Sequence, residues 1–190
     1  MTKENIKSMD DAHILTEIRN GNNAVFRDLI NRYEGLVSAT IIGMIGRCSE
    51  AEDIGQEVFV RFYKARENFR GDSAIGTYLT RIAINLSLNE IKRRSRRSQL
   101  FHHSDNEISE IEDKNNRPDM DENREIIQRA IQKLAPKFRS VIVLRLIDGY
   151  STEETAKILK VPIGTVLSRL ARSQKKLKEI LSPMLELDHG

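Results

Sequence analysis

The stretch from Tyr150 to Lys178 constrains the fold of this chain more than any other part of it. Ser151 or Thr152 can cap a first helix, and Glu154 follows two or three residues later to complete a capping box. Pro162 restricts the residue before it to extended geometry, so this first helix must end near Lys160. The pattern predicts two short helices joined by a tight turn.

The second helix of this pair has an apolar inner face and a cationic outer one. It starts near Gly164 or Thr165, with Val166 and Leu170 facing inward. The outward residues are Ser168, Arg169 and Arg172, and a cationic stripe continues through Lys175, Lys176 and Lys178. A helical hairpin without function has the same periodicity, but cations in a row suit phosphates. We therefore predict a helix-turn-helix whose second helix enters the DNA major groove.

The composition predicts an all-α chain, which at this length could form one domain or two small ones. Of 190 residues, 39% are hydrophobic and 31% are charged, which favours small cores over one large core. Glycine and proline are few, and no β-branched run alternates with period two. The net charge is only +3, so a nucleic-acid surface has to come from local clusters of cations.

Cysteine content and hydropathy bear on the compartment. Cys48 is the one cysteine, so no intramolecular disulfide can form, which fits a reducing compartment. The N-terminus is polar and lacks the apolar core of a signal peptide. The most apolar stretch, 36–45, is too short to span a membrane. We expect a cytoplasmic protein without a membrane span.

Periodicity divides the chain into three parts and predicts two small helical domains joined by a flexible linker. In the first domain, residues 1–97, a frayed start is expected up to Asp11 and amphipathic helices from Ala12 onward, including one that Ser49 would cap. Residues 98–123 are acidic and polar, contain a proline and show no period, so we expect a flexible linker there. Residues 124–190 give four more helices, which could bury a core of their own.

An acidic, hydrogen-bonding patch is predicted on the helix after Ser49. Glu52, Asp53, Gln56 and Glu57 lie at spacings that place them on one side of it. Carboxylates in the first turns of a helix are also simply stabilised by its dipole, so the pattern alone fits a solvated face. A metal site would need ligands from another helix, and no histidine lies nearby in sequence. We expect no metal, no cofactor and no catalytic residue.

A second polar face is predicted on the helix after the loop at 69–74. Arg, Asn and Lys recur on it at one-turn intervals, a pattern that suits phosphates and base edges. Its residues are Thr77, Arg81, Asn85, Asn89 and Lys92, with further cations following at Arg93, Arg94, Arg96 and Arg97. We interpret this face as a nucleic-acid surface.

Two long runs resemble one protein family. The run AEDIGQEVFVRFYKARENFRGDSAIGTYLTRIAINLSLNEIKRR is similar to region two of the extracytoplasmic-function sigma factors of bacterial RNA polymerase. The run LAPKFRSVIVLRLIDGYSTEETAKILKVPIGTVLSRLARSQKKL is similar to region four of the same family. With the stretch between them, the resemblance covers about residues 26–181, in the family's order.

The resemblance implies a role for each polar face. It implies that the first domain, residues 1–97, binds core polymerase and the minus-ten element, and that 124–190 binds the minus-thirty-five element. The polymerase clamp coiled coil would be bound by Glu52, Asp53, Gln56, Glu57 and Phe59. A base flipped from the non-template strand would be held by the loop with Arg70, Asp72 and Ser73. The minus-ten element would be read and melted by Thr77, Tyr78, Arg81, Asn85, Asn89, Lys92 and Arg93. The minus-thirty-five contacts would be Thr165, Ser168, Arg169, Arg172 and Lys176.

The physics of promoter opening agrees with these roles. Removing a base from the stack costs a few kcal/mol, and capture on a basic, partly aromatic surface returns about 1–3 kcal/mol for each stacked base. Phe69 and Tyr78 are the nearby rings, and both are equally suited to the core. No hydrolysis is required, so the resemblance implies a binding protein and not an enzyme.

Four positions depart from the family pattern. Tyr78 stands where tryptophan is common, and Leu167 where a basic residue is common. Ala171 replaces larger residues, and Lys160 occupies the position of a usual turn glycine. If Lys160 is left-handed, that backbone costs about 1–2 kcal/mol.

The resemblance also implies partners, and alternatives stay open beside it. The expected partners are core RNA polymerase (its clamp coiled coil and its flap region), promoter DNA in double- and single-stranded form, and an anti-sigma protein. One alternative is a stand-alone helix-turn-helix regulator whose N-terminal module senses or dimerises. Another is an enzyme that uses the carboxylates near Asp53 with a metal. The promoter bases, the inducing signal and the arrangement of the two modules do not follow from the residues.

Overall fold

The computed structural model describes residues 10–69, 71, 73–101 and 122–188. Every regular element within these residues is a helix, which confirms the all-α prediction. In chain order the elements are α1 (Asp11–Arg19), α2 (Asn23–Ile45), α3 (Ser49–Ala65), α4 (Ile75–Phe101), α5 (Glu122–Lys133), α6 (Pro136–Ile142), a π-helical turn η1 (Val143–Ile147), α7 (Thr152–Leu159) and α8 (Ile163–Asp188).

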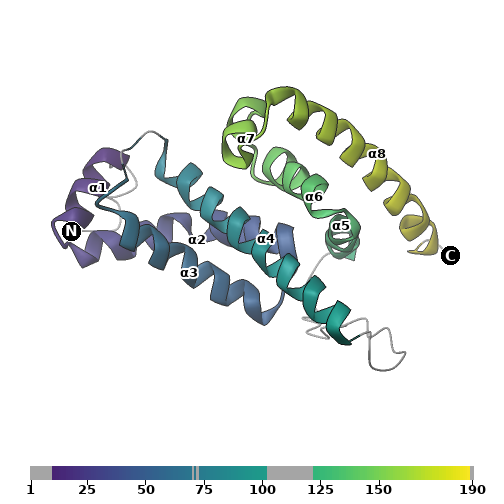
Figure 1. Ribbon diagram of the computed structural model, residues 1–190, viewed down its shortest axis with the longest axis horizontal. Helices are drawn as coiled ribbons and strands as arrows, with labels where there is room; N and C mark the ends of the chain where they lie inside the picture. Colours follow the sequence, from purple (N-terminus) through teal and green to yellow (C-terminus); the bar gives the residue numbers. More distant parts are fainter. Residues whose placement is uncertain (1–9, 70, 72, 102–121, 189–190) are drawn as a thin grey trace.

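Helix α2 is the centre of the N-terminal module and packs against α1, α3 and α4 (Figure 1). Its inward residues Leu29, Val37 and Ile41 are at most 1% exposed, and Phe62 of α3 and Leu79 of α4 are fully buried against the same core. Burying a side chain of this size contributes about 1.5–3 kcal/mol. The apolar faces of these amphipathic helices thus meet in one continuous core.

The start of α3 differs from the expectation. Cys48, and not Ser49, occupies the N-cap position, because Cys48 has the extended backbone of a cap and its carbonyl accepts from the Ala51 amide at 3.0 Å. Ser49 lies in the first turn, where its hydroxyl donates to the Glu50 carboxylate at 3.2 Å. The prediction that Ser49 caps this helix is wrong by one residue.

Helix covers both ends of the stretch expected to be a linker. Helix α4 continues past residue 97 to Phe101, and α5 begins at Glu122. The remaining linker positions, 102–121, lie outside the described residues.

The C-terminal module contains one element that periodicity did not predict. The residues after Pro136 form α6 and then widen into the turn η1, where the Asp148 amide donates to the Val143 carbonyl five residues earlier at 2.9 Å. Such π-helical turns are rare and are frequently found at functional sites. Here the turn directs Val143 and Leu144 into the core that α2 and α4 form.

The helix-turn-helix forms as predicted. The Ser151 hydroxyl accepts from the Glu154 amide at 3.1 Å, and the Glu154 carboxylate accepts from the Ser151 amide at 2.8 Å, which completes the capping box. Helix α7 ends at Lys160, whose backbone is left-handed at φ 53°. Helix α8 starts one residue after Pro162 and is anchored on α6 by the Ser173 hydroxyl, which donates to the Phe138 carbonyl at 3.2 Å.

The two modules lie against each other. Figure 1 shows α5, α6 and α7 beside α4 and the end of α2, with α8 on the side away from them. Val143, Leu144 and Ile158 belong to the same buried cluster as the N-terminal helices. The C-terminal helices therefore share part of their core with the first module and do not bury all of it alone.

Candidate nucleic-acid interface

Helix α3 presents the predicted acidic patch to solvent. Glu52, Asp53 and Gln56 are exposed, and Glu57 is half-buried while it accepts from the Arg61 guanidinium at 2.7 Å. Phe59 is 7% exposed and packs in the core, so the structure does not bring it to the surface with the other four. The patch available for binding is therefore polar and formed by four side chains.

An exposed valine, Val60, adjoins this patch and was not among the residues predicted to bind polymerase. Val60 follows Gln56 by one helical turn, and 42% of it is exposed, whereas Val58 is fully buried. The sequence did hold a sign of this, because Val60 is an apolar residue that lies outside the apolar stripe of this helix. Protein interfaces combine apolar contacts with a surrounding rim of polar groups, so Val60 could contribute the apolar part.

The loop before α4 is held at both ends by α1. The Arg19 guanidinium donates to the carbonyls of Arg66 at 3.0 Å and Phe69 at 2.6 Å. The Asp11 carboxylate accepts from the Ile75 amide at 2.8 Å, which fixes the start of α4. Of the predicted loop contacts, Ser73 is half-buried, and Arg70 and Asp72 lie outside the described residues.

A hollow of about 410 Å³ opens between this loop and α1. Asp11 on its wall also accepts from the Tyr33 hydroxyl at 3.1 Å. Burial, followed by the nearby Asp11 charge, raises the Tyr33 pKa to about 12, so this hydroxyl remains a donor at neutral pH. The rest of the lining is Asp10, Ala12, Leu15, Arg32, Phe69, Gly71, Ser73 and Ala74.

The polar face of α4 divides into a covered part and an open part. Thr77, Tyr78 and Arg81 are half-buried, whereas Asn85 and Asn89 are exposed. The covered residues lie in the half of α4 that begins at the loop, and the open ones lie toward its basic end. The sequence placed all of these residues on one face but could not show that part of it is covered.

Tyr78 and Phe69 belong to an aromatic cluster. Their ring centroids lie 4.8 Å apart, and the ring of Phe62 lies 6.2 Å from that of Tyr78. The Arg81 guanidinium sits 5.8 Å from the centroid of the Tyr78 ring. Phe69 is 8% exposed, so it acts as a core residue, while the half-buried Tyr78 keeps an edge at the surface.

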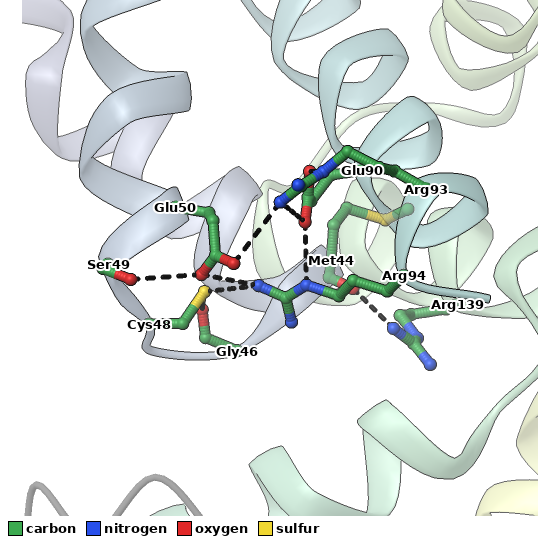
Figure 2. A network of polar contacts seen from close by, with 9 residues as sticks. All are labelled: Met44, Gly46, Cys48, Ser49, Glu50, Glu90, Arg93, Arg94 and Arg139. Carbon is green, nitrogen blue, oxygen red and sulfur yellow. Dashed lines mark hydrogen bonds and ion pairs between the residues drawn. The ribbon is translucent and has the colours of Figure 1, made fainter. Parts of the chain in front are cut away.

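A network of ion pairs joins the basic end of α4 to the start of α3 (Figure 2). The Glu90 carboxylate accepts from Arg93 at 2.7 and 2.9 Å and from Arg94 at 2.9 Å. Arg94 donates onward to Glu50 at 3.0 Å and to the Cys48 sulfur at 3.0 Å. Hydrogen bonds from Arg93, and then from Arg94, lower the Glu90 pKa against the effect of burial. These two cations therefore have a structural role in addition to any contact with DNA.

The exposed cations beyond this network surround a shallow hollow of about 500 Å³. Lys92, Arg96 and Arg97 line it together with Asn89 and Arg93. Lys92 and Arg93 are the predicted DNA contacts in this group. The whole basic end of α4 can therefore attract phosphates.

On α8 the predicted base-reading face is open. Ser168, Arg172 and Lys176 are exposed, and Thr165 and Arg169 are half-buried. The Ser168 hydroxyl donates to the Thr165 carbonyl at 3.1 Å. The opposite side of α8 is buried through Val166 and Ser173, which keeps the polar side outward.

Two exposed apolar residues flank this face and were not predicted as functional. Ile163 and Leu167 are 47% and 53% exposed and lie one turn apart at the start of α8. Leu167 is the position at which the sequence departs from the basic pattern of the family it resembles. An apolar side chain in the major groove can contact a thymine methyl group.

Within the described part of the chain, no group of His, Cys, Asp or Glu side chains is arranged to hold a metal ion. The same residues contain no helix that is both long and apolar enough to cross a membrane.

These features define a class: a helical protein of two modules, one with an acidic face and a basic helix, the other with a helix-turn-helix. Comparison with known protein families agrees with this class and identifies a single family within it. The family model for sigma-70 region 2 matches residues 29–97, and that for sigma-70 region 4 matches residues 124–177.

Curated relatives match almost the full length of the chain. It is 32% identical to the RNA polymerase sigma-H factor of Pseudomonas aeruginosa over 184 residues, covering 92% of this chain and 95% of the relative. It is 31% identical to the ECF RNA polymerase sigma-E factor of Escherichia coli K12 over 189 residues, covering 94% and 98%. The chain belongs to the sigma-70 family, in its extracytoplasmic-function (ECF) group.

Solved structures share the fold. The sigma factor RpoE in complex with the anti-sigma factor NepR from Bartonella quintana superposes with a TM-score of 0.67 at 23% identity, covering 82% of this chain and 96% of that one. CnrH in complex with the cytosolic domain of CnrY superposes with a TM-score of 0.65 at 24% identity, covering 91% and 97%.

Proposed function

We propose that this sigma factor binds core RNA polymerase, directs it to promoters with minus-ten and minus-thirty-five elements, and helps to melt the DNA. The observation that carries the proposal is the presence of both sigma-70 regions, in order, on one chain. The protein then works in the cytoplasm as an initiation factor, by binding and not by catalysis.

The polymerase contact is assigned to the exposed patch on α3. Glu52, Asp53, Gln56 and Glu57 offer acceptors to a basic partner, and Val60 adds an apolar contact beside them. Polar groups with an apolar neighbour are a composition that protein interfaces use, and the clamp coiled coil is the proposed partner. The flap region of polymerase is the partner proposed for the C-terminal module.

DNA contact is assigned to three surfaces. The loop with Ser73 and the hollow beside it would hold a flipped base, and the exposed part of α4 would hold the displaced strand. Helix α8 would enter the major groove at the minus-thirty-five element with the polar side that includes Ser168 and Arg172. Each module alone binds weakly, and tethering both to one polymerase raises the effective concentration of each for its element.

An anti-sigma protein is proposed as the regulator, because the similar sigma factor RpoE was solved in complex with the anti-sigma factor NepR. The stand-alone regulator has no observation in its favour, since the curated sigma factors cover both modules.

The proposed function is tested by substituting one residue of the exposed patch on α3. Asp53→Ala should weaken binding to core polymerase at least about tenfold, equivalent to about 1.4 kcal/mol, and should reduce run-off transcription in proportion. Glu34→Ala is the matched control, because Glu34 is an exposed carboxylate on α2, away from the patch. Equal polymerase binding by the two variants would refute the assignment of that contact to the α3 patch. Absence of a promoter-dependent transcript with the wild-type protein would refute the proposed function.

A further inference from the structure

The start of α8 carries a row of apolar side chains beside its polar side. Ile163 and Leu167 are 47% and 53% exposed, and the exposed Ala171 continues the row one turn further along the helix. Residues four apart on a helix are neighbours on its surface, with about 5–6 Å between their Cβ atoms. We call Ile163, Leu167 and Ala171 the apolar row.

Packing against α6 and α7 fixes the direction in which the apolar row points. Val166 is fully buried in a cluster with Val141 of α6 and Ala156 of α7. Two turns further along α8, the fully buried Ser173 is hydrogen-bonded to a carbonyl of α6 at 3.2 Å. These contacts prevent α8 from rotating, so the exposure of Leu167 follows from the packing of the whole module.

Leu167 stands between two small residues on this side of α8. Gly164 lies three residues before it, and a Cβ atom at that position would meet nothing within 4 Å. Ala171 lies four residues after it, and its side chain is a single methyl group. Leu167 can therefore reach into a groove before its nearest neighbours touch the walls of that groove.

The cations that follow the apolar row favour DNA as the partner that covers it. Arg172, Lys175 and Lys176 are exposed on the same helix. Phosphates on the two sides of a major groove supply the opposite charge, and in helix-turn-helix proteins the first residues of the second helix face the base edges. Ile163 and Leu167 lie in the first two turns of α8, where such contacts are made.

The chemistry of leucine restricts the base edge that Leu167 can contact favourably. In the major groove guanine, cytosine and adenine are recognised through hydrogen-bond donors and acceptors, whereas thymine also presents its C5-methyl group. A leucine placed against a donor or acceptor would bury that group without a partner, which is unfavourable. The thymine methyl group is the one feature of the groove floor that an apolar side chain matches.

We propose that Leu167 contacts a thymine methyl group in the minus-thirty-five element, so that this position of the element is an A·T pair. The inference rests on the proposed function and assigns a specificity-determining residue to it. Ile163 lies one helical turn away, and base pairs stack about 3.4 Å apart. Its side chain would therefore lie over a base pair no more than about two steps from that thymine.

The first experiment selects the element that the holoenzyme binds. Core polymerase with the full chain is incubated with templates randomised over both promoter elements, and the bound templates are sequenced. Wild type should enrich thymine at one position of the minus-thirty-five element. Leu167→Met should keep this preference, and Leu167→Ala should lose it, because alanine is too short to reach the methyl group.

Leu146→Ala is the matched control for this selection. Leu146 is 56% exposed, as Leu167 is to a similar degree, but it lies on η1 and outside α8. Its substitution should leave the preferred bases unchanged. Circular dichroism checks that the helices of every variant persist.

The second experiment removes only the methyl group from the DNA. Deoxyuridine replaces the enriched thymine in one selected template, and in a control template it replaces a thymine between the two elements. Wild-type holoenzyme should bind the first template about fourfold more weakly, which corresponds to about 0.8 kcal/mol for a group of this size. It should bind the control template unchanged, and Leu167→Ala holoenzyme should not distinguish thymine from deoxyuridine.

The salt dependence of binding separates a base contact from a phosphate contact. Leu167→Ala changes no charge, so the slope of log affinity against log salt concentration should stay the same. Lys176→Ala should instead weaken binding on all templates and reduce that slope by about 1.

Three results would overturn the inference. They are a wild type without a thymine preference in the minus-thirty-five element, a wild type insensitive to deoxyuridine, and a Leu167→Ala variant that weakens binding equally on every template, which would assign Leu167 to a protein contact. Failure of the wild-type holoenzyme to enrich any template would instead contradict the proposed function itself.

Discussion

Lys160 adopts a backbone that a lysine rarely occupies. It ends α7 with φ 53° and ψ 49°, and it is the one non-glycine residue with positive φ in the described parts of the chain. The Cβ atom of an L-residue then lies too close to the following carbonyl, which costs about 1–2 kcal/mol. The cost persists because the turn is fixed on both sides, by α7 and by the Val161 amide, which donates to the Ala156 carbonyl at 3.1 Å.

We predict that Lys160→Gly stabilises the protein by about 1 kcal/mol, because glycine adopts left-handed geometry without this strain. The measurement is the free energy of unfolding by urea denaturation. Lys157→Gly is the matched control, since Lys157 is exposed in the interior of α7, and there glycine should cost about 1 kcal/mol. Two changes of the same sign would contradict the explanation.

At the scale of elements, α4 is held by its charged end as well as by its apolar stripe. Glu90 is 9% exposed and lies between two guanidinium groups, both of which connect α4 to the start of α3 through Glu50. Hydrogen bonds to charged groups inside a protein contribute about 1.5–3 kcal/mol. The exposed pair Glu57–Arg61 has similar spacing but little burial.

Glu90→Gln is therefore expected to lower the free energy of unfolding by about 2 kcal/mol at pH 7. The hydrogen bonds from Arg93 and Arg94 lower the Glu90 pKa in the folded state, so its contribution is present above the unfolded pKa and is lost as pH falls through the folded pKa. The difference between wild type and variant should thus shrink in acid.

Denaturation at pH 7 and at pH 3 measures both effects. Glu57→Gln serves as the control, and its exposed ion pair should change stability by less than about 0.5 kcal/mol. A Glu90 variant no less stable than this control at neutral pH would show that the network of Figure 2 contributes nothing.

At the scale of the whole molecule, the contact between the two modules is expected to depend on the charge of the Asp148 carboxylate. Asp148 faces the Thr40 hydroxyl across the contact, and its other oxygen is buried without a hydrogen-bond partner. Burial raises the Asp148 pKa to about 6, while the hydrogen bond from Thr40 opposes this. The neighbouring Tyr150 also has a raised pKa, because of burial first, and stays neutral.

The chain with its two modules in contact should therefore bind a proton more tightly than a chain whose modules have separated, in which Asp148 would have its ordinary pKa near 3.9. The contact is favoured as pH falls through about 6. It is disfavoured above that pH by at most about 3 kcal/mol. We predict that the radius of gyration of the free chain is larger at pH 8 than at pH 5.

Asp148→Asn should remove this dependence, because the amide keeps a hydrogen-bonding group toward Thr40 and carries no charge. Scattering at the two pH values, on wild type and variant side by side, makes the comparison. The same pH profile in both proteins would assign the effect to another group.

Much of the fold followed from the residues themselves. Local spacing predicted the all-helical class, the capping box at Ser151 and the polar faces of α3 and α8, because these depend on neighbours within a few positions in the chain. The cap of α3 was misplaced by one residue, and the π-helical turn at Val143–Ile147 was not foreseen, since packing against α2 and not local propensity favours it.

The sequence by itself determined which helices form, which of their sides are polar, and the family to which the chain belongs. Only the tertiary structure decided that Phe59 lies in the core, that the Tyr150 hydroxyl meets that of Thr80, and that the missing side chain of Gly43 makes room for Val143. The physical reason is distance along the chain. Helix formation is set by contacts three or four residues apart, whereas Gly43 and Val143 meet through packing of elements that lie far apart in sequence.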